Sequence, residues 1–204
     1  MKLVRQLYDW VLHWAQTPYG PAALFLLSFA EASFFPIPPD PLLIALVLGA
    51  RTKAFRFAAV CALASVTGAL LGYAIGHFAW YTPGGELTGL AHFFFNNVPG
   101  FTPDRFEVVQ GLYKDWDFWI IFTAGFTPLP YKVFTITGGV FNINLVMFVI
   151  ASIISRSARF FLVAGLIWKY GEGIQGFIDK YFNWLAIGFT VLLVGGFVLI
   201  KYML

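Results

Sequence analysis

The stretch Glu31-Ala32-Ser33-Phe34-Phe35-Pro36-Ile37-Pro38-Pro39-Asp40-Pro41 decides the fold, because it places two carboxylates and four prolines within an otherwise apolar region. Proline removes a backbone donor and clashes with the preceding turn, so a helix must break here. The arms, residues 21–35 and 42–50, would rise only about 22 Å and 14 Å as helices, against a hydrocarbon core of about 30 Å. A broken backbone is tolerated in a bilayer only where protein or trapped water surrounds it. We therefore predict that residues 21–50 form a re-entrant hairpin.

The composition predicts an integral membrane protein. The 204 residues are 59% hydrophobic, 20% aromatic and only 11% charged, which is more apolar surface than a soluble domain could bury. The net charge of +3 does not indicate nucleic acid, because the basic residues form no patch interleaved with aromatics. Cys61 is the single cysteine, so a disulfide framework and a cysteine metal site are excluded. We expect no cofactor and no metal.

A second proline-broken stretch, Thr127-Pro128-Leu129-Pro130-Tyr131-Lys132, repeats the pattern of Phe35-Pro36-Ile37-Pro38-Pro39-Asp40, with a base where the first has an acid. Its arms are also short, so we predict a second re-entrant hairpin over residues 118–141. Internal repeats with helices broken at matching positions are typical of transporters, whose substrates bind where the breaks meet. Two unrelated proline kinks are the alternative. Under the repeat interpretation, the gating residues are Pro36, Pro38, Pro128, Pro130, Gly138 and Gly139.

The remaining segments complete an all-α integral membrane protein with a single membrane domain, residues 1–204. It combines inverted-topology repeats, two re-entrant hairpins, about three full spanning helices and interfacial amphipathic helices. The predicted segments are an interfacial helix (1–16), the first hairpin (21–50), a span (57–80), an extramembrane amphipathic segment (81–117), the second hairpin (118–141), and two further spans (145–168 and 183–204).

The basic residues are distributed unequally about these segments, which predicts the orientation. Cytoplasmic loops of membrane proteins carry an excess of lysine and arginine, so the amino terminus is expected in the cytoplasm. A single span, 57–80, separates the two hairpins, so they enter from opposite sides and the repeats are inverted. The cytoplasmic bases would be Lys2, Arg5, Arg51, Lys53, Arg56, Lys169 and Lys180, and those of the far side Arg105, Lys114 and Lys201.

Arg156 and Arg159 stand in the middle of the span 145–168, where each charge costs about 2.5 to 3.5 kcal/mol on insertion scales. Their spacing places both on one helical face. One interpretation is a structural ion pair with Glu31 or Asp40. The other, which we favour because two arginines exceed the need of a single pair, is a phosphate site formed by Arg156, Arg159 and Lys132.

Glu31 and Asp40 are then candidates to carry protons. Burial favours the protonated form of a carboxylate, whereas a nearby arginine favours the charged form, so protonation can respond to whether an anion is bound. We do not expect an enzyme. No metal set or nucleophile–base pair is evident, since the histidines are scattered at His13, His77 and His92.

Over roughly residues 31–171 the chain resembles the DedA family of membrane proteins, within the wider superfamily of SNARE-associated Golgi (VTT-domain) proteins. The second re-entrant motif of that family is matched by residues 126–132 with Gly138 and Gly139. Pro128 stands where many members have arginine, and Lys132 carries the base instead, which is similar to the YqaA-like branch. The first re-entrant motif and the paired arginines of the family match Glu31, Pro36, Pro38, Asp40, Arg156 and Arg159.

The resemblance implies a function. Members are implicated in returning undecaprenyl phosphate across the bacterial inner membrane with proton motive force involved, and eukaryotic relatives scramble phospholipids. We therefore expect a multi-pass inner-membrane transporter of a lipid phosphate, whose partners are membrane lipids, that substrate and protons, with a homo-oligomer left open and no nucleic acid. The alternatives are a proton-coupled exporter of ions or cationic drugs, and a membrane scaffold whose buried charges only fix helix packing.

Overall fold

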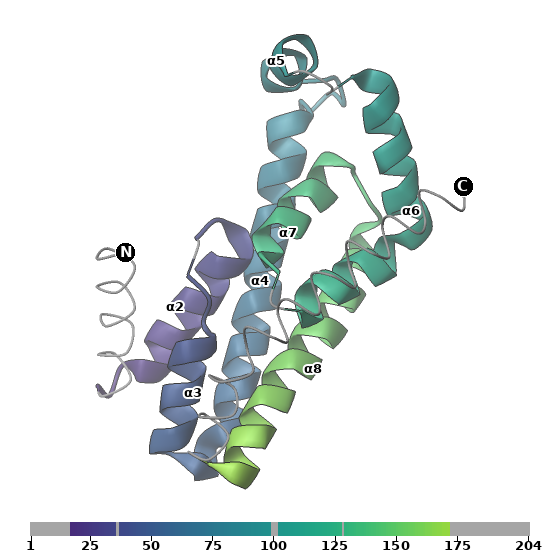
Figure 1. Ribbon diagram of the computed structural model, residues 1–204. Helices are drawn as coiled ribbons and strands as arrows, with labels where there is room; N and C mark the ends of the chain where they lie inside the picture. The colour runs from purple at the N-terminus through teal and green to yellow at the C-terminus, as the bar shows by residue number, and fades with distance from the viewer. Residues whose placement is uncertain (1–16, 36, 99–101, 128, 172–204) are drawn as a thin grey trace.

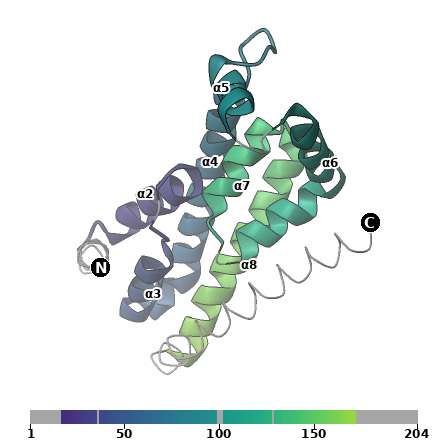
Figure 2. The ribbon, with the colours of Figure 1, turned by 45° about the horizontal axis from the view of Figure 1, so that its top comes forward.

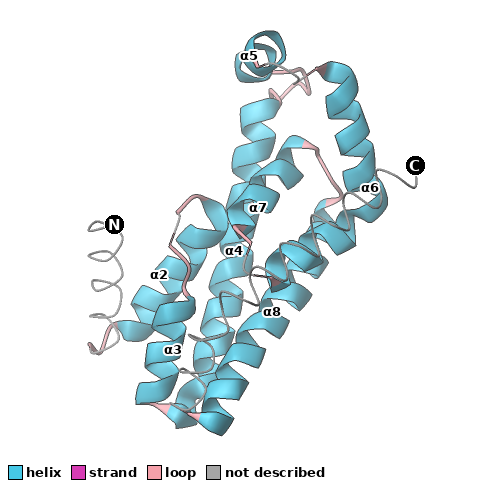
Figure 3. Ribbon diagram, in the orientation of Figure 1, coloured by secondary structure: helices cyan, strands magenta, loops and turns pink. Residues whose placement is uncertain are grey.

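The computed structural model describes residues 17–35, 37–98, 102–127 and 129–171, and these residues confirm the all-α prediction (Figure 3). Within them no β-strand forms, and only an isolated bridge joins Tyr81 to Leu87. The predicted helices at 1–16 and 183–204 lie outside the described residues. In chain order the elements are α2 (Gly20–Ser33), α3 (Asp40–Gly49), a 3₁₀ turn η1 (Arg51–Lys53), α4 (Ala54–Trp80), α5 (Gly89–Asn97), α6 (Pro103–Phe126), α7 (Tyr131–Val140) and α8 (Leu145–Tyr170).

Two helical segments, Arg51–Trp80 and Leu145–Tyr170, are long and apolar enough to cross a membrane by length and composition. They contain the predicted spans 57–80 and 145–168. The long helices of these two segments, α4 and α8, pack against each other (Figure 1). We call this pair of helices the frame.

The first hairpin, hereafter hairpin 1, consists of α2 and α3. The helix α2 ends at Ser33, and the amides of Phe34 and Phe35 both donate to the Ala30 carbonyl to close its last turn. Described residues 34, 35 and 37–39 are not helical, as the prolines of this stretch lead one to expect, and α3 begins at Asp40 with a proline in its first turn. The chain thus runs from one end of the frame to its middle and returns to the same end (Figure 1).

Hairpin 2 consists of the second half of α6 together with α7, and its break lies between the end of α6 at Phe126 and the start of α7 at Tyr131. The sequence predicted that its first arm would begin at residue 118, whereas α6 is one longer helix from Pro103. Trp116, with φ −120° and ψ 19°, kinks α6 close to the predicted boundary. The predicted segment 81–117 therefore contains α5 and the first half of α6.

The two hairpins approach from opposite ends of the frame, and their tips meet beside α4 and α8 near the middle of the molecule (Figures 1 and 2). A glycine stripe on α4 makes this possible. A Cβ at Gly68 would overlap the carbonyl of Phe29 in hairpin 1, and one at Gly76 would overlap that of Ile136 in hairpin 2. The absence of side chains at these glycines thus lets both hairpins lie directly against α4.

The apolar interior is divided into two cores, one for each hairpin. The hairpin 1 core uses the first half of α4 and the second half of α8. The hairpin 2 core uses the first half of α8, together with Ala69 of α4 and Ala32 near the tip of hairpin 1. Polar side chains are concentrated at the boundary between the two cores. The hairpin 1 core includes Leu24, Leu27, Leu42, Leu43, Leu46, Val47, Phe57, Phe160, Ala164 and Ile167, and the hairpin 2 core includes Ala69, Ile121, Ala124, Tyr131, Phe141, Ile143, Phe148 and Ala151.

Candidate functional site

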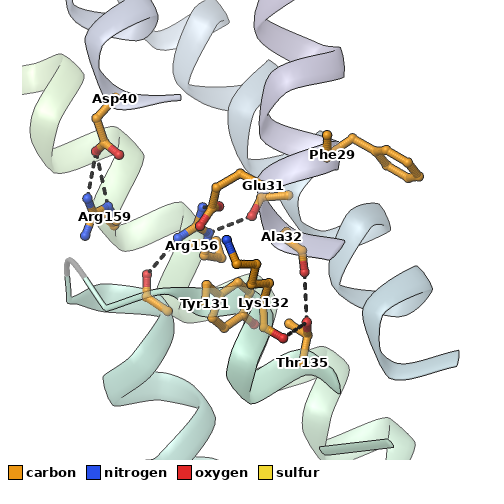
Figure 4. A network of polar contacts seen from close by, with 12 residues as sticks. Phe29, Glu31, Ala32, Asp40, Tyr131, Lys132, Thr135, Arg156 and Arg159 are labelled. Carbon is orange, nitrogen blue, oxygen red and sulfur yellow. Dashed lines mark hydrogen bonds and ion pairs between the residues drawn. The ribbon is translucent and has the colours of Figure 1, made fainter. Parts of the chain in front are cut away.

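The hairpin tips bring together all five charged residues that the sequence predicted for the site, which we call the five-charge cluster (Figure 4). Hairpin 1 supplies a carboxylate on each side of its break, hairpin 2 supplies a lysine in the first turn of α7, and α8 supplies both arginines. With three bases and two acids, the formal charge of the cluster is +1. Its members are Glu31, Asp40, Lys132, Arg156 and Arg159.

Arg156 is buried, with 2% of its surface exposed, and each of its three nitrogens has a partner. Nη2 donates to Glu31 Oε2 at 2.8 Å, and Nε donates to Ser65 Oγ at 2.6 Å. Nη1 donates to the Gly125 carbonyl at 3.5 Å. The guanidinium also lies over the rings of Tyr131 and Phe160, 4.8 and 4.6 Å from their centroids, so it contacts an aromatic ring of each core.

Arg159, one helical turn further along α8, pairs with Asp40. Its Nη2 and Nε donate to the same carboxylate oxygen, Oδ1, at 2.8 and 3.2 Å, and Nη1 donates to the Phe126 carbonyl at 3.3 Å. Both arginines therefore connect the two hairpins, since each binds a carboxylate of hairpin 1 and a carbonyl in the last turn of α6. Cations are favoured at that end of a helix, where carbonyl groups lack helical partners.

Two more polar contacts join the hairpins directly. Lys132 Nζ donates to the Phe35 carbonyl just beyond the end of α2, at 3.2 Å. Thr135 Oγ1 contacts the Ala32 carbonyl at 2.8 Å. We call these two hydrogen bonds the tip contacts, because they hold the break of hairpin 1 against the start of α7.

The structure pairs both arginines. The sequence left open a structural ion pair with Glu31 or Asp40, and it favoured a phosphate site because two arginines exceed the need of a single pair. In the structure each arginine has its own carboxylate. The surplus positive charge belongs instead to Lys132, whose hydrogen-bond partner within the described residues is a carbonyl. An anion would thus be attracted by the net +1 of the whole cluster rather than by an unpaired arginine.

The predicted gating residues occupy different environments. Pro38 and Pro130 are exposed at the two breaks, whereas Pro36 and Pro128 lie outside the described residues. Gly138 and Gly139 lie in the last turns of α7, away from the break. A Cβ at Gly139 would overlap the Tyr73 carbonyl on α4, so the structure gives this glycine a packing role.

Sequence reasoning missed the neutral residues that hold Arg156. Ser65 stands three positions before Gly68 and so extends the small-residue stripe of α4, a signal that could have indicated a contact with another helix. Tyr131, next to Pro130, is fully buried, and its hydroxyl donates to Ser152 Oγ at 2.6 Å. No group of three or more metal-binding side chains occurs among the residues that the structure describes.

Comparison with known proteins places the chain among bacterial relatives. It is 35% identical over 203 residues to a protein of Haemophilus influenzae named uncharacterized, an alignment that covers 98% of this chain and 100% of the relative. A likewise uncharacterized protein of Histophilus somni is 33% identical over 166 residues, covering 81% of this chain and 82% of the relative. No protein-family model and no solved structure matches the chain. The chain therefore belongs to the same family as these Haemophilus and Histophilus proteins.

Proposed function

We propose that this protein is a multi-pass transporter of the bacterial inner membrane that moves a lipid phosphate, undecaprenyl phosphate or a phospholipid, with coupling to proton motive force. One observation carries the proposal: a five-charge cluster of net charge +1 lies where two oppositely directed hairpins meet, beside two helices long enough to span a bilayer. A residual positive charge in hydrocarbon is costly, and an anionic head group would offset it.

The surfaces of the long helices support a lipid substrate. A phosphate in the cluster would leave its hydrocarbon tails outside, where they need an apolar surface facing the bilayer. Both long helices expose large apolar side chains on one side along most of their length. These are Leu63, Leu70, Leu71, Ile75 and Phe78 on α4, and Ile150, Ile153, Ile154, Phe161 and Leu162 on α8.

The mechanism we propose is alternating access, with the two hairpins as gates. Because they approach from opposite ends of the frame, moving one of them away would open the cluster to one side only (Figure 2). Such a movement must break the tip contacts of Lys132 and Thr135. Protonation of Glu31 or Asp40 would weaken the corresponding ion pair, which provides a way for protons to bias the gates.

The sequence motifs support a place in the DedA family. Both acids of the first motif and both arginines of the later one lie in a single cluster, which is the arrangement that a shared site would require. We include membership of that family in the proposal, and with it the choice of undecaprenyl phosphate as the first substrate to test.

A membrane scaffold is the second candidate, and the one-to-one pairing of both arginines favours it. Under that hypothesis the ion pairs fix helix packing, and their loss would lower abundance without any separate loss of transport. A cation exporter is less favoured than either, because the net charge of the cluster would repel its substrate.

Reconstitution into liposomes tests the proposal. Wild-type protein should move labelled undecaprenyl phosphate under an imposed pH gradient, and Arg159→Gln and Glu31→Gln should each slow it by at least about tenfold. Arg159→Gln removes a positive charge on which phosphate binding depends, and Glu31→Gln removes a carboxylate on which proton coupling depends. Lys114→Gln, which removes an exposed positive charge of α6, is the matched control and should transport normally. Phosphatidylcholine in the same vesicles reports leakage.

Three results would contradict the proposal. Equal movement of all lipids in every variant would indicate nonspecific leakage. Normal transport per folded molecule by Arg159→Gln and Glu31→Gln would favour the scaffold. Loss of cation export in Glu31→Gln, with Arg159→Gln active, would favour the exporter.

A further inference from the structure

The two ion pairs of the cluster differ in how completely they are enclosed. In the inner pair, the side chains of Arg156 and Glu31 are 3% and 10% exposed. In the outer pair, those of Arg159 and Asp40 are 13% and 20% exposed. A ligand that enters the cluster therefore reaches the outer pair with less disruption of the surrounding protein.

The inner pair has little capacity to accept a ligand. The Arg156 nitrogens are bonded to a carboxylate, a hydroxyl and a carbonyl, and its guanidinium contacts the rings of Tyr131 and Phe160. A phosphate would have to displace several of these partners at once. Leaving Glu31 buried without its cation would add a large desolvation cost. The inner pair is thus suited to stay closed.

The outer pair, in contrast, can accept a ligand. Asp40 accepts both the Nε and the Nη2 hydrogen bonds of Arg159 through Oδ1 alone. Within the described part of the chain, Oδ2 accepts no hydrogen bond. Nε and Nη2 form one edge of the guanidinium, and a phosphate can bind such an edge with two oxygens in parallel. Asp40 therefore occupies with one oxygen the place that a phosphate would occupy with two (Figure 4).

We propose that the Asp40 carboxylate holds the place of the substrate phosphate on Arg159, and that binding exchanges this carboxylate for the head group while the Glu31–Arg156 pair stays closed. The inference rests on the proposed function and assigns different roles to the two acids. Asp40 competes with the substrate, whereas Glu31 keeps Arg156 in position. The empty site is thereby kept paired, which limits the cost of a bare guanidinium in the membrane.

Equilibrium binding of a simple probe tests the exchange. Dodecyl phosphate is titrated into the full-length protein in an uncharged detergent, with dodecylphosphocholine as the control for insertion into micelles, and heat is recorded by calorimetry. If Asp40 occupies Arg159 about nine-tenths of the time, Asp40→Asn should bind the probe about tenfold more tightly than wild type. Arg159→Gln should lose binding.

Glu31→Gln is the matched control, because it removes the same charge from the neighbouring carboxylate. We expect Glu31→Gln to gain clearly less affinity than Asp40→Asn, since it changes the charge of the cluster but Glu31 does not occupy the binding edge. An equal gain in Glu31→Gln and Asp40→Asn would indicate a general charge effect and would overturn the exchange. Asp40→Asn binding no more tightly than wild type, while Arg159→Gln loses binding, would overturn it and leave the proposed function intact.

Failure of wild type and of Asp40→Asn alike to bind the probe would overturn the proposed function and this inference with it. A second measurement needs no variant that might misfold. Infrared difference spectra of the wild-type protein should show a change in the carboxylate bands when dodecyl phosphate binds, because one carboxylate loses its arginine. Binding without any carboxylate change would contradict the exchange.

Discussion

Arg156 joins the two halves of the molecule through its contacts with both cores. Its guanidinium lies over Tyr131, which belongs to the hairpin 2 core, and over Phe160, which belongs to the hairpin 1 core. Cation–π contacts of a desolvated arginine contribute about 2 kcal/mol. They do not depend on the protonation state of Glu31. The rings can therefore hold Arg156 in place even when its ion pair is weakened.

Substitutions of Tyr131 separate its ring from its hydroxyl. Tyr131→Phe loses the hydrogen bond to Ser152 and should destabilise the protein by about 1 kcal/mol, with transport retained. Tyr131→Leu also removes the ring beneath Arg156 and should cost about 2 kcal/mol more, with transport reduced. Thermal unfolding of the purified protein and the liposome assay measure the two effects. Equal losses of stability and of transport in both variants would assign the role of Tyr131 to its hydroxyl alone.

At the residue scale, the sequence identified the five charges but not their pairing. An arginine or an acid within an apolar helix is conspicuous, because its insertion is costly. Which acid meets which arginine depends on the rotation of each helix about its axis, and the sequence pattern does not determine this. Ser65 and Tyr131 were missed for a related reason, since neutral residues in apolar helices are common and give no comparable signal.

Among the elements, α4 depends most on small residues, because it contacts both hairpins. Gly68 approaches the Phe29 carbonyl of α2, and Gly72 approaches Thr135 of α7. At both glycines the space that a side chain would need is already filled. At Gly68 it is filled by the backbone of Phe29, and at Gly72 by the side chain of Thr135. Since backbone cannot rotate away as a side chain can, even one methyl group at Gly68 must move α2 as a whole.

Alanine substitutions on two helices test this close approach. Gly68→Ala should destabilise the protein by about 1–3 kcal/mol through overpacking, and it should impair transport by displacing hairpin 1. Gly111→Ala, in α6, is the control, because nothing lies within 4 Å of the added Cβ. Alanine favours a helix by roughly 0.5–1 kcal/mol over glycine, so this change should stabilise the protein. Thermal unfolding distinguishes the two, and destabilisation of similar size in both would refute the packing explanation.

The helix breaks were predictable, whereas the extent of α6 was not. Prolines end α2 and begin α3 at the expected places, because their chemistry excludes an internal helical hydrogen bond. The continuation of α6 from Pro103 across residue 117 has no such signal. Its kink at Trp116 occurs without a proline at that position, so the turn and break residues on which sequence reasoning depends do not mark it.

On the scale of the whole molecule, the two hairpins contact different cores and approach from opposite ends of the frame (Figure 1). Inverted-topology repeats remain a prediction, made from two proline-containing stretches separated by one long helix, and the opposite approach of the hairpins is consistent with it (Figure 1). The tip contacts were not predicted, because they join residues 97 and 103 positions apart. Such contacts become apparent only when the two halves are placed together.

Cysteine labelling tests the predicted topology. Cys61 is fully buried, so it should remain unlabelled and the native sequence can serve as the background. Tyr19→Cys and Lys53→Cys flank hairpin 1 and should both be protected from an impermeant maleimide in intact cells, since a re-entrant hairpin begins and ends on the cytoplasmic side. Glu86→Cys, beyond α4, should be labelled. Labelling of Tyr19→Cys but not Lys53→Cys would show that the intervening segment spans the membrane.

The wide sequence separation of the ion pairs has a consequence for biosynthesis. Glu31 precedes Arg156 by 125 positions, and Asp40 precedes Arg159 by 119. A ribosome therefore delivers both carboxylates long before it delivers their arginines. In the inner membrane that we propose as the location, the acids must remain hydrated or take up protons in the interval, because hydrocarbon does not tolerate an uncompensated charge. We therefore expect hairpin 1 to reach its final position only after translation has passed α8.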